Sequence, residues 1–253
     1  MIDKKEFIVP EYILDILLKD RTTGKNIMWG TDQYGYDPET NMTVEQVSGN
    51  VILPRVFKSL DEQKSRTNDK AEVFTPLEII KRMNDSVEED FNGNDIDYIN
   101  RKVLEITCGE APYLVSRYDV STGDIISLDK REGILDRKMR KVNEMGENNW
   151  IHHMLSVLES VYGYEWQGDS LLLARINIFK DINDWHMNMF GKNLGDDNIN
   201  ETIVVAEHII SNIIQMDGLN MTVPYTDIPA RVMDWENDEM VRFDDKTDES
   251  PLF

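Results

Sequence analysis

The stretch that decides the fold runs from Val103 to Leu114 and reads VLEITCGEAPYL. Its opening is a short apolar run that ends on an acid, Glu105, as a buried parallel strand does. The turn that follows contains Gly109, which has no side chain and lets the backbone bend tightly. An α/β sheet uses such a turn to bring backbone amides close to a cofactor, although a single glycine after a strand is a weak signal by itself.

The flanking sequence alternates between strand and helix patterns. Residues 75–85 predict a helix in which Thr75 is the cap, Pro76 takes the first helical position and Glu78 completes a capping box. The other expected elements are an edge strand at 51–59, strands at 102–106 and 160–166, a helix at 168–179, a helix at 201–216 whose β-branched start also suits a strand, and a hairpin at 230–235 and 239–243. We therefore expect a three-layer α/β fold with a mostly parallel sheet and ligands at the carboxyl ends of its strands.

The chain divides into three zones that differ in sequence pattern. Residues 1–70 predict a helical and irregular extension, residues 71–232 the core, and residues 233–253 a hairpin with an acidic tail. Within the core, about 120–157 form an insertion, because Glu105 and Glu165 stand 60 positions apart where a compact βαβ unit needs about 20. This insertion is locally basic, with Lys130, Arg131, Arg137, Lys138, Arg140 and Lys141. A solvated helix explains these charges, and a contact to nucleic-acid phosphates is the alternative.

A second acid stands in the matching place after the next strand. Glu165 ends the strand predicted at 160–166, where an acid accepts hydrogen bonds from ribose hydroxyls. Trp166 follows it directly and would lie against an adenine ring. Each residue alone also reads as ordinary structure, a surface acid and a core aromatic. Together with Gly109 they predict a nucleotide-like cofactor site.

These segments resemble the N6-adenine DNA methyltransferases of restriction–modification systems, particularly the proteins described as restriction endonuclease M subunits. The family's E-V-F-T-P element stands here as residues 72–76, and its L-E-P-A-C-G-T-G-A-F-L loop is matched at Glu105, Cys108, Gly109 and Leu114. Ala111 replaces the second glycine and Glu110 a small polar residue, departures that would tighten or close the methionine pocket. The resemblance covers about residues 50–235. It implies a class I, Rossmann-like S-adenosylmethionine methyltransferase core that binds this cofactor through Phe74, Thr75, Pro76, Glu105, Cys108, Gly109, Glu165, Trp166 and Asp217.

The family's catalytic tetrad is degenerate. Adenine-N6 enzymes use Asn/Asp-Pro-Pro-Tyr/Phe to hold the target amine and stack on the flipped base. The nearest counterpart is Thr222, Val223, Pro224 and Tyr225, so Thr222, Pro224 and Tyr225 are the candidate catalytic residues. Threonine is the poorer acceptor and valine removes a proline constraint. The resemblance therefore implies adenine-N6 methylation in a restriction–modification or phage setting, with weak or lost catalysis.

Charge favours a different kind of partner. The formal net charge of −21 repels a phosphate backbone, and sequence-independent DNA affinity comes largely from Lys and Arg. A soluble protein with an acidic tail explains this composition. One alternative is a catalytically silent, acidic protein that engages a defence factor, for example by imitating DNA. The other is one subunit of a split enzyme whose partner reads the DNA target.

The remaining composition bears on compartment. A single cysteine, Cys108, excludes an intramolecular disulfide and fits a reducing compartment. No apolar run approaches the roughly 18 residues that span a bilayer. The four histidines form no HExxH or CxxC-like set, so we expect no metal site. We expect a cytoplasmic protein without a membrane partner.

Overall fold

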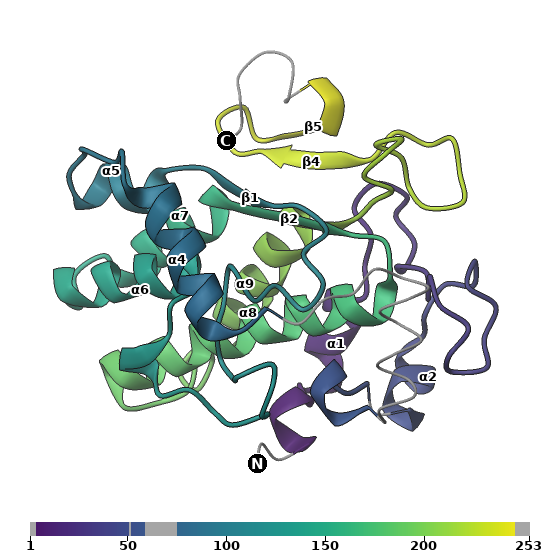
Figure 1. The fold of residues 1–253 in the computed structure, drawn as a ribbon, viewed down its shortest axis with the longest axis horizontal. Helices are drawn as coiled ribbons and strands as arrows, with labels where there is room; N and C mark the ends of the chain where they lie inside the picture. The colour runs from purple at the N-terminus through teal and green to yellow at the C-terminus, as the bar shows by residue number, and fades with distance from the viewer. Residues whose placement is uncertain (1–3, 51, 59–74, 246–253) are drawn as a thin grey trace.

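Three short parallel strands form the centre of the computed structural model, which describes residues 4–50, 52–58 and 75–245 (Figure 1). They are β1 (Val103–Glu105), β2 (Val161–Glu165) and β3 (Ile213–Gln215), in the order β1-β2-β3. The register pairs Glu105 with Gly163 and Glu165 with Gln215. The carboxyl ends of all three strands therefore meet at one edge of the sheet, and β2 extends two residues beyond β1.

Helices cover one face of this sheet. Helices α7, α8 and α9 contact β2, and α8 and α9 also contact β3. The helices described are α1 (Glu11–Leu17), α2 (Val44–Gly49), α4 (Leu77–Glu88), α5 (Asp95–Asn100), α6 (Ile134–Met145), α7 (Trp150–Ser160), α8 (Gly168–Phe190) and α9 (Ile199–Asn212), with short 3-10 turns at Lys4–Phe7, Arg55–Phe57 and Leu128–Lys130. Helix α8 carries apolar residues around most of its circumference and is buried along most of its length. It therefore lies at the centre of the core.

The opposite face of the sheet is covered by an antiparallel hairpin. Strands β4 (Arg231–Asp234) and β5 (Glu239–Arg242) pair with each other and lie across the sheet from the helices (Figure 1). A second apolar cluster joins the two layers, with Tyr162, Ile214 and Met216 on the sheet side and Ala230, Val232 and Phe243 on the hairpin side. The predicted hairpin is confirmed, as are the α/β class and the parallel sheet. Over the described residues, the sheet has three strands and its second face contacts a hairpin rather than helices.

The N-terminal segment docks onto the sheet. The Gln215 side chain accepts from Met28 N (2.7 Å) and donates to Met28 O (2.9 Å), and Gly168 N donates to Trp29 O (2.9 Å). A Cβ at Gly168 would overlap the carbonyl oxygen of Met28, so this approach requires glycine. Trp29 is fully buried in the same apolar cluster as α8. The described part of the predicted N-terminal extension is therefore built into the core.

Three local predictions are wrong. The helix cap is not formed by Thr75, because α4 begins at Leu77 with Pro76 in the cap position and no side-chain cap hydrogen bond. Residues 52–58 contain a 3-10 turn instead of a strand. The third is wrong only at its end, because the helix predicted at 201–216 forms from its β-branched start to Asn212 and the strand β3 follows. Residues 59–74, which include the charged segment 61–70 and Phe74, lie outside the described residues.

The basic segment of the insertion faces inward more than outward. The Arg131 guanidinium contacts Asp181 (2.5 Å) and Asp184 (2.7 Å), and Lys138 is buried on Ser160 Oγ (2.7 Å). Arg137 is paired with Asp85, Glu88 and Glu132. Lys130 is exposed and Lys141 is partly exposed, so a solvated surface describes these two and a phosphate contact stays a prediction for them. Neither alternative describes Arg131, Arg137 and Lys138. Their charges join α6 to α4 and α8, and the insertion supplies the crossover from β1 to β2.

Candidate functional site

A cavity of about 970 Å³ opens where the carboxyl ends of the three parallel strands meet. Its walls come from the loop after β1, the residues that follow β2, the turn after β3 and the 3-10 turn that begins at Arg55. This edge is where open α/β sheets bind ligands, and the size suits a nucleotide-like molecule. Of the predicted site residues, the cavity brings together Thr75, Glu105, Cys108, Gly109, Glu165, Trp166, Asp217 and Tyr225.

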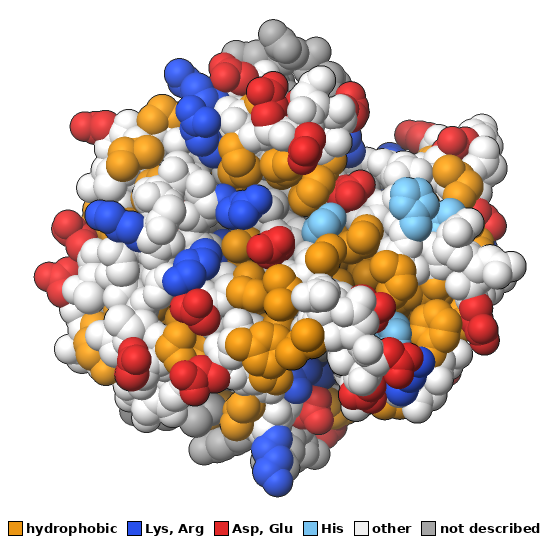
Figure 2. All heavy atoms as spheres, turned by 180° about the vertical axis from the view of Figure 1, so that it is seen from behind, with side chains coloured by type: hydrophobic (Ala, Val, Ile, Leu, Met, Phe, Trp, Pro, Cys, Tyr) orange, Lys and Arg blue, Asp and Glu red, His pale blue; other side chains and the backbone are white. Residues whose placement is uncertain are grey.

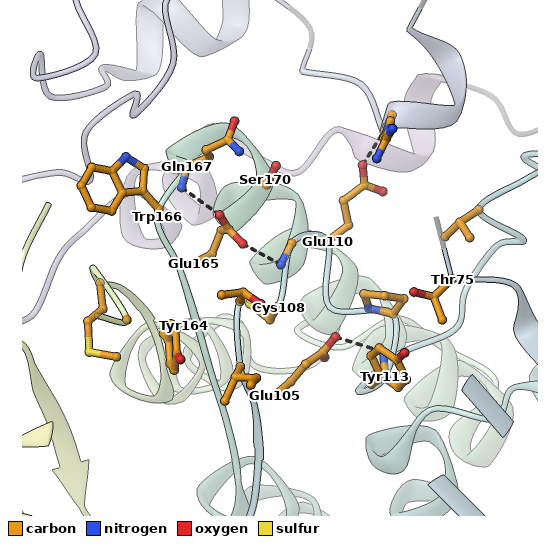
Figure 3. Close-up of a pocket in the computed structure, with 18 of the residues that line it drawn as sticks. Thr75, Glu105, Cys108, Glu110, Tyr113, Tyr164, Glu165, Trp166, Gln167 and Ser170 are labelled. Atoms are coloured by element: carbon orange, nitrogen blue, oxygen red, sulfur yellow. Dashed lines mark hydrogen bonds between the residues drawn. The ribbon is translucent and has the colours of Figure 1, made fainter. Parts of the chain in front are cut away.

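Glu165 ties two of these walls together (Figure 3). Its Oε2 accepts a hydrogen bond from Gly109 N (2.9 Å) and its Oε1 accepts from Gln167 N (3.0 Å). The side chain is 8% exposed, on the cavity wall. A carboxylate accepts several hydrogen bonds at once, so the chemistry of Glu165 suits a ligand hydroxyl.

Glu105 has a more structural position than the sequence suggests. Its two oxygens accept from Tyr113 N (3.3 Å) and Leu114 N (3.2 Å), which closes the loop after β1 onto the end of its own strand. Burial is the largest influence on this carboxyl and raises its pKa to about 8, with the nearby Glu165 carboxylate adding to the rise. At neutral pH Glu105 is therefore mostly uncharged and adds little negative potential to the cavity.

The loop keeps a glycine-like backbone even where glycine has been replaced. Gly109 has φ +54° and Ala111 has φ +60°, both in the left-handed region. A Cβ at Gly109 would meet nothing within 4 Å, so this residue faces open space. The Ala111 methyl is buried and does not line the cavity. The expectation that Ala111 would close the pocket is therefore wrong.

Glu110 lines the cavity but is held against its wall. Its Oε1 accepts from Arg55 N (2.7 Å) and its Oε2 accepts from the Tyr118 hydroxyl (2.5 Å). The Tyr118 hydroxyl accepts in turn from Asn177 Nδ2 (3.1 Å), on α8. The residue that replaces a small polar one in the family loop thus anchors the segment around Arg55.

One feature of the loop differs from the dinucleotide-binding pattern. Residues 106–133, all of them described, contain turns, an isolated β-bridge between Tyr118 and Ile125 and the 3-10 turn Leu128–Lys130, but no α-helix before α6. The loop after β1 therefore leads into no helix, and its backbone amides meet the cavity without the positive end of a helix dipole.

Only one of the three candidate catalytic residues lines the cavity. Tyr225 lines the cavity, 42% exposed, and its ring meets Trp166 edge to face with centroids 5.1 Å apart. Pro224 is buried and Thr222 accepts from Asp217 N (2.8 Å) through its backbone carbonyl. Neither of these two lines the cavity. A shared catalytic site for this trio therefore has no support, and Tyr225 alone remains at the cavity.

Asp217 is a cavity residue whose carboxylate is engaged by its own turn. Oδ1 accepts from Leu219 N (2.9 Å) and Oδ2 from Asn220 Nδ2 (2.6 Å). Thr75 also lines the cavity, whereas Pro76 does not. Cys108 is buried at the cavity floor, and burial raises the pKa of its thiol well above the ordinary range. It is therefore uncharged and unreactive at neutral pH.

Sequence reasoning missed part of the lining. Arg55, Val56, Tyr118, Gln167 and Ser170 all face the cavity. Pro54 suggested an edge strand, and no local sequence pattern shows that Arg55 turns toward the loop that contains Glu110, 55 positions away. Gln167 and Ser170 follow Glu165 closely, so the strand-to-helix junction was the one available signal.

Comparison of this chain with models of protein families, with curated proteins and with solved structures found no match. Within the described ranges, no helix has the length and apolar character needed to cross a membrane. Nor do three metal-ligating side chains converge anywhere in the described part of the chain.

Proposed function

We propose that the cavity binds S-adenosylmethionine and that the chain is a methyltransferase-like protein. One observation carries the proposal: a single cavity at the carboxyl edge of a parallel sheet collects Thr75, the Cys108–Gly109 turn, Glu165, Trp166 and Asp217, which the family resemblance had selected from four separate segments. When bound, the cofactor would supply an electrophilic methyl group on a sulfonium. A three-layer Rossmann-like methyltransferase core belongs to the same proposal.

The residues present suit this ligand by their chemistry. Glu165 offers carboxylate lone pairs to ribose hydroxyls, and Trp166 and Tyr164 offer aromatic surface to a purine. Gly109 leaves room beside the Glu165 carboxylate because a Cβ there would contact nothing. The negative carboxylates of the lining favour a cationic sulfonium and ammonium.

Methyl transfer to adenine N6 is the reaction that the resemblance implies, and we expect it to be weak or absent in the isolated chain. Transfer needs the amine held and aimed, and one lost polar contact at such a site costs on the order of 10²-fold. Here Thr222 and Pro224 lie outside the cavity lining, so two of the three candidate contacts are missing. A DNA-reading subunit from another chain would then have to complete the site.

The second candidate is a catalytically silent acidic protein on the same fold. The net charge of −21, together with inward-facing arginines on and beside α6, favours a basic protein as its partner. A defence factor of restriction–modification or phage systems would fit this description. The cytoplasm is the compartment in which both candidates would act.

Calorimetric titration with S-adenosylmethionine and S-adenosylhomocysteine tests the proposal. Glu165→Gln should weaken binding about 10-fold or more, because a hydrogen bond to a charged group contributes about 1.5–3 kcal/mol. Glu144→Gln, an exposed acid on α6 paired with Lys141, is the matched control and should bind like the native chain. Absence of heat at millimolar ligand, in protein whose thermal melt shows it to be folded, would refute cofactor binding.

A further inference from the structure

Two aromatic side chains meet at nearly a right angle beside the cavity. The rings of Trp166 and Tyr225 are inclined at 75° with centroids 5.1 Å apart, and Trp166 Nε1 donates to the Tyr225 hydroxyl at 3.4 Å. Both side chains line the cavity, and Tyr225 is 42% exposed. They come from different segments, since Trp166 follows β2 and Tyr225 lies in the turn after β3. The two rings are therefore brought together at the cavity by the fold and not by closeness in sequence.

The backbone holds both walls in place. Thr226 N donates to Val223 O (3.1 Å), which closes a turn with Pro224 second and Tyr225 third. Tyr225 has φ +61°, the conformation that a type II turn needs at its third residue and that usually selects glycine. On the other wall, the Trp166 carbonyl accepts from Gln215 Nε2 (2.8 Å). A tyrosine kept in a strained conformation at a cavity suggests that its ring serves a ligand.

The charge beside these rings is negative. The acids that line the cavity are Glu105, Glu110, Glu165 and Asp217, whereas Arg55 is the one basic residue in the described lining. Even with Glu105 mostly uncharged, three carboxylates face one guanidinium. A cleft with low-dielectric walls concentrates such a potential and draws cations toward it.

Exposed apolar side chains also lie in the segments that form the cavity. Leu219 is 93% exposed and Ile106 is 63% exposed, and both line the cavity. Ile228, in the same loop as Tyr225, is 47% exposed. Apolar side chains around a negative aromatic pocket match the long aliphatic stem of a basic side chain that ends in a charged head.

We propose that Trp166 and Tyr225 form a subsite for an organic cation, the alkylammonium or guanidinium group of a basic protein segment. Aromatic faces attract such cations by about 0.5–2 kcal/mol, more than they attract a neutral group of the same shape. A nucleobase would also stack here, but its phosphates would face three carboxylates in a chain of net charge −21. This subsite goes beyond the proposed cofactor site and occupies the aromatic side of the same cavity.

The test compares choline with its neutral isostere 3,3-dimethylbutan-1-ol, followed through the indole N–H resonances of the tryptophans. The Trp166 resonance is assigned by its loss in Trp166→Phe, and we expect choline to shift it. We expect the isostere to bind at least about fivefold more weakly than choline, which corresponds to about 1 kcal/mol. N-acetylarginine methylamide should compete with choline. Equal binding of choline and the isostere would overturn the proposal.

Variants separate the rings from the fold and the subsite from the cofactor. Tyr225→Phe keeps an aromatic face and should keep choline binding, whereas Tyr225→Leu should abolish it. Trp235→Phe, which removes a tryptophan stacked on His208, is the control and should leave choline binding at the Trp166 resonance unchanged. Tyr225→Leu should still bind S-adenosylhomocysteine if the cofactor proposal holds. Choline binding without S-adenosylhomocysteine binding would refute the cofactor proposal alone. Binding of S-adenosylhomocysteine without choline binding would refute the cation subsite alone.

Discussion

Ala111 shows how a replaced residue can leave a backbone unchanged. It stands where the family loop has glycine, keeps φ at +60° and buries its methyl group away from the cavity. The left-handed conformation costs a non-glycine residue about 1–2 kcal/mol, and a buried methyl recovers about 0.8 kcal/mol. The two effects nearly cancel, which explains why alanine is tolerated at a glycine position.

The same balance predicts the outcome of Ala111→Gly. The variant relieves backbone strain but loses the methyl contact and gains unfolded-state freedom, so its free energy of unfolding should change by no more than about 0.5 kcal/mol. Ala206→Gly is the control, because Ala206 is equally buried but lies inside α9. It should lose about 1.5–2 kcal/mol through helix propensity and the lost methyl. Urea unfolding measures both, and equal losses would contradict the role given to the left-handed backbone.

Residue-level prediction succeeded where a side chain follows directly from the end of a strand. Glu105, Glu165 and Trp166 reach the cavity because the carboxyl ends of parallel strands share one edge. It failed where chemistry depends on a neighbour remote in sequence. Glu105 reaches the cavity, but no sequence pattern showed that the backbone of its own loop would donate a hydrogen bond to each of its oxygens. The Thr222–Tyr225 segment was judged by its order of residues, whereas its turn directs Tyr225 alone to the cavity.

At the scale of elements, local patterns predicted β1, β2 and the hairpin. Each is an apolar or alternating run with a turn or an acid at its end. Strand β3 was hidden because Ile213 continues directly from α9 without a turn signal between them. The edge strand at 51–59 failed because Pro54 suits the start of a 3-10 turn equally well. Docking of residues 28–30 at the sheet edge has no local signature at all.

Gly168 tests that docking. Gly168→Ala would place a methyl against the Met28 carbonyl at the start of α8, and we expect a loss of about 1–3 kcal/mol in unfolding free energy, as for other overpacked sites. Gly49→Ala in α2 is the control, since a Cβ there contacts nothing within 4 Å, and it should be neutral or stabilising by up to about 1 kcal/mol. Hydrogen exchange should show the loss of protection at residues 28–30. Unchanged protection there would mean that this close approach does not hold the segment.

For the whole molecule, charge is the dominant property. Figure 2 shows one face on which Lys and Arg side chains are interspersed with acidic and apolar ones. Arg131, Arg137 and Lys138 are buried or ion-paired, so they are not free to neutralise phosphates. The molecule therefore presents its acids to the solvent while several of its cations stabilise the packing of α6 against its neighbours.

This distribution predicts that the isolated chain binds duplex DNA poorly at physiological salt. Affinity for DNA rises steeply as salt falls when a protein neutralises several phosphates, and here we expect a nearly flat salt dependence. Fluorescence anisotropy of a labelled duplex between low and physiological salt measures it. Nanomolar binding with a steep negative salt slope would show that these cations are available after all.

The hydrogen bonds between Met28 and Gln215 also set the order in which the protein can be made. The two residues are 187 positions apart, so at about 5–20 residues per second the ribosome needs on the order of ten seconds or more to reach the second after the first. During that interval Trp29 and the apolar face of α1 have emerged without the strand and helices that bury them. The nascent chain therefore exposes an apolar segment from early in translation. We expect chaperones that act at the ribosomal exit tunnel to bind it.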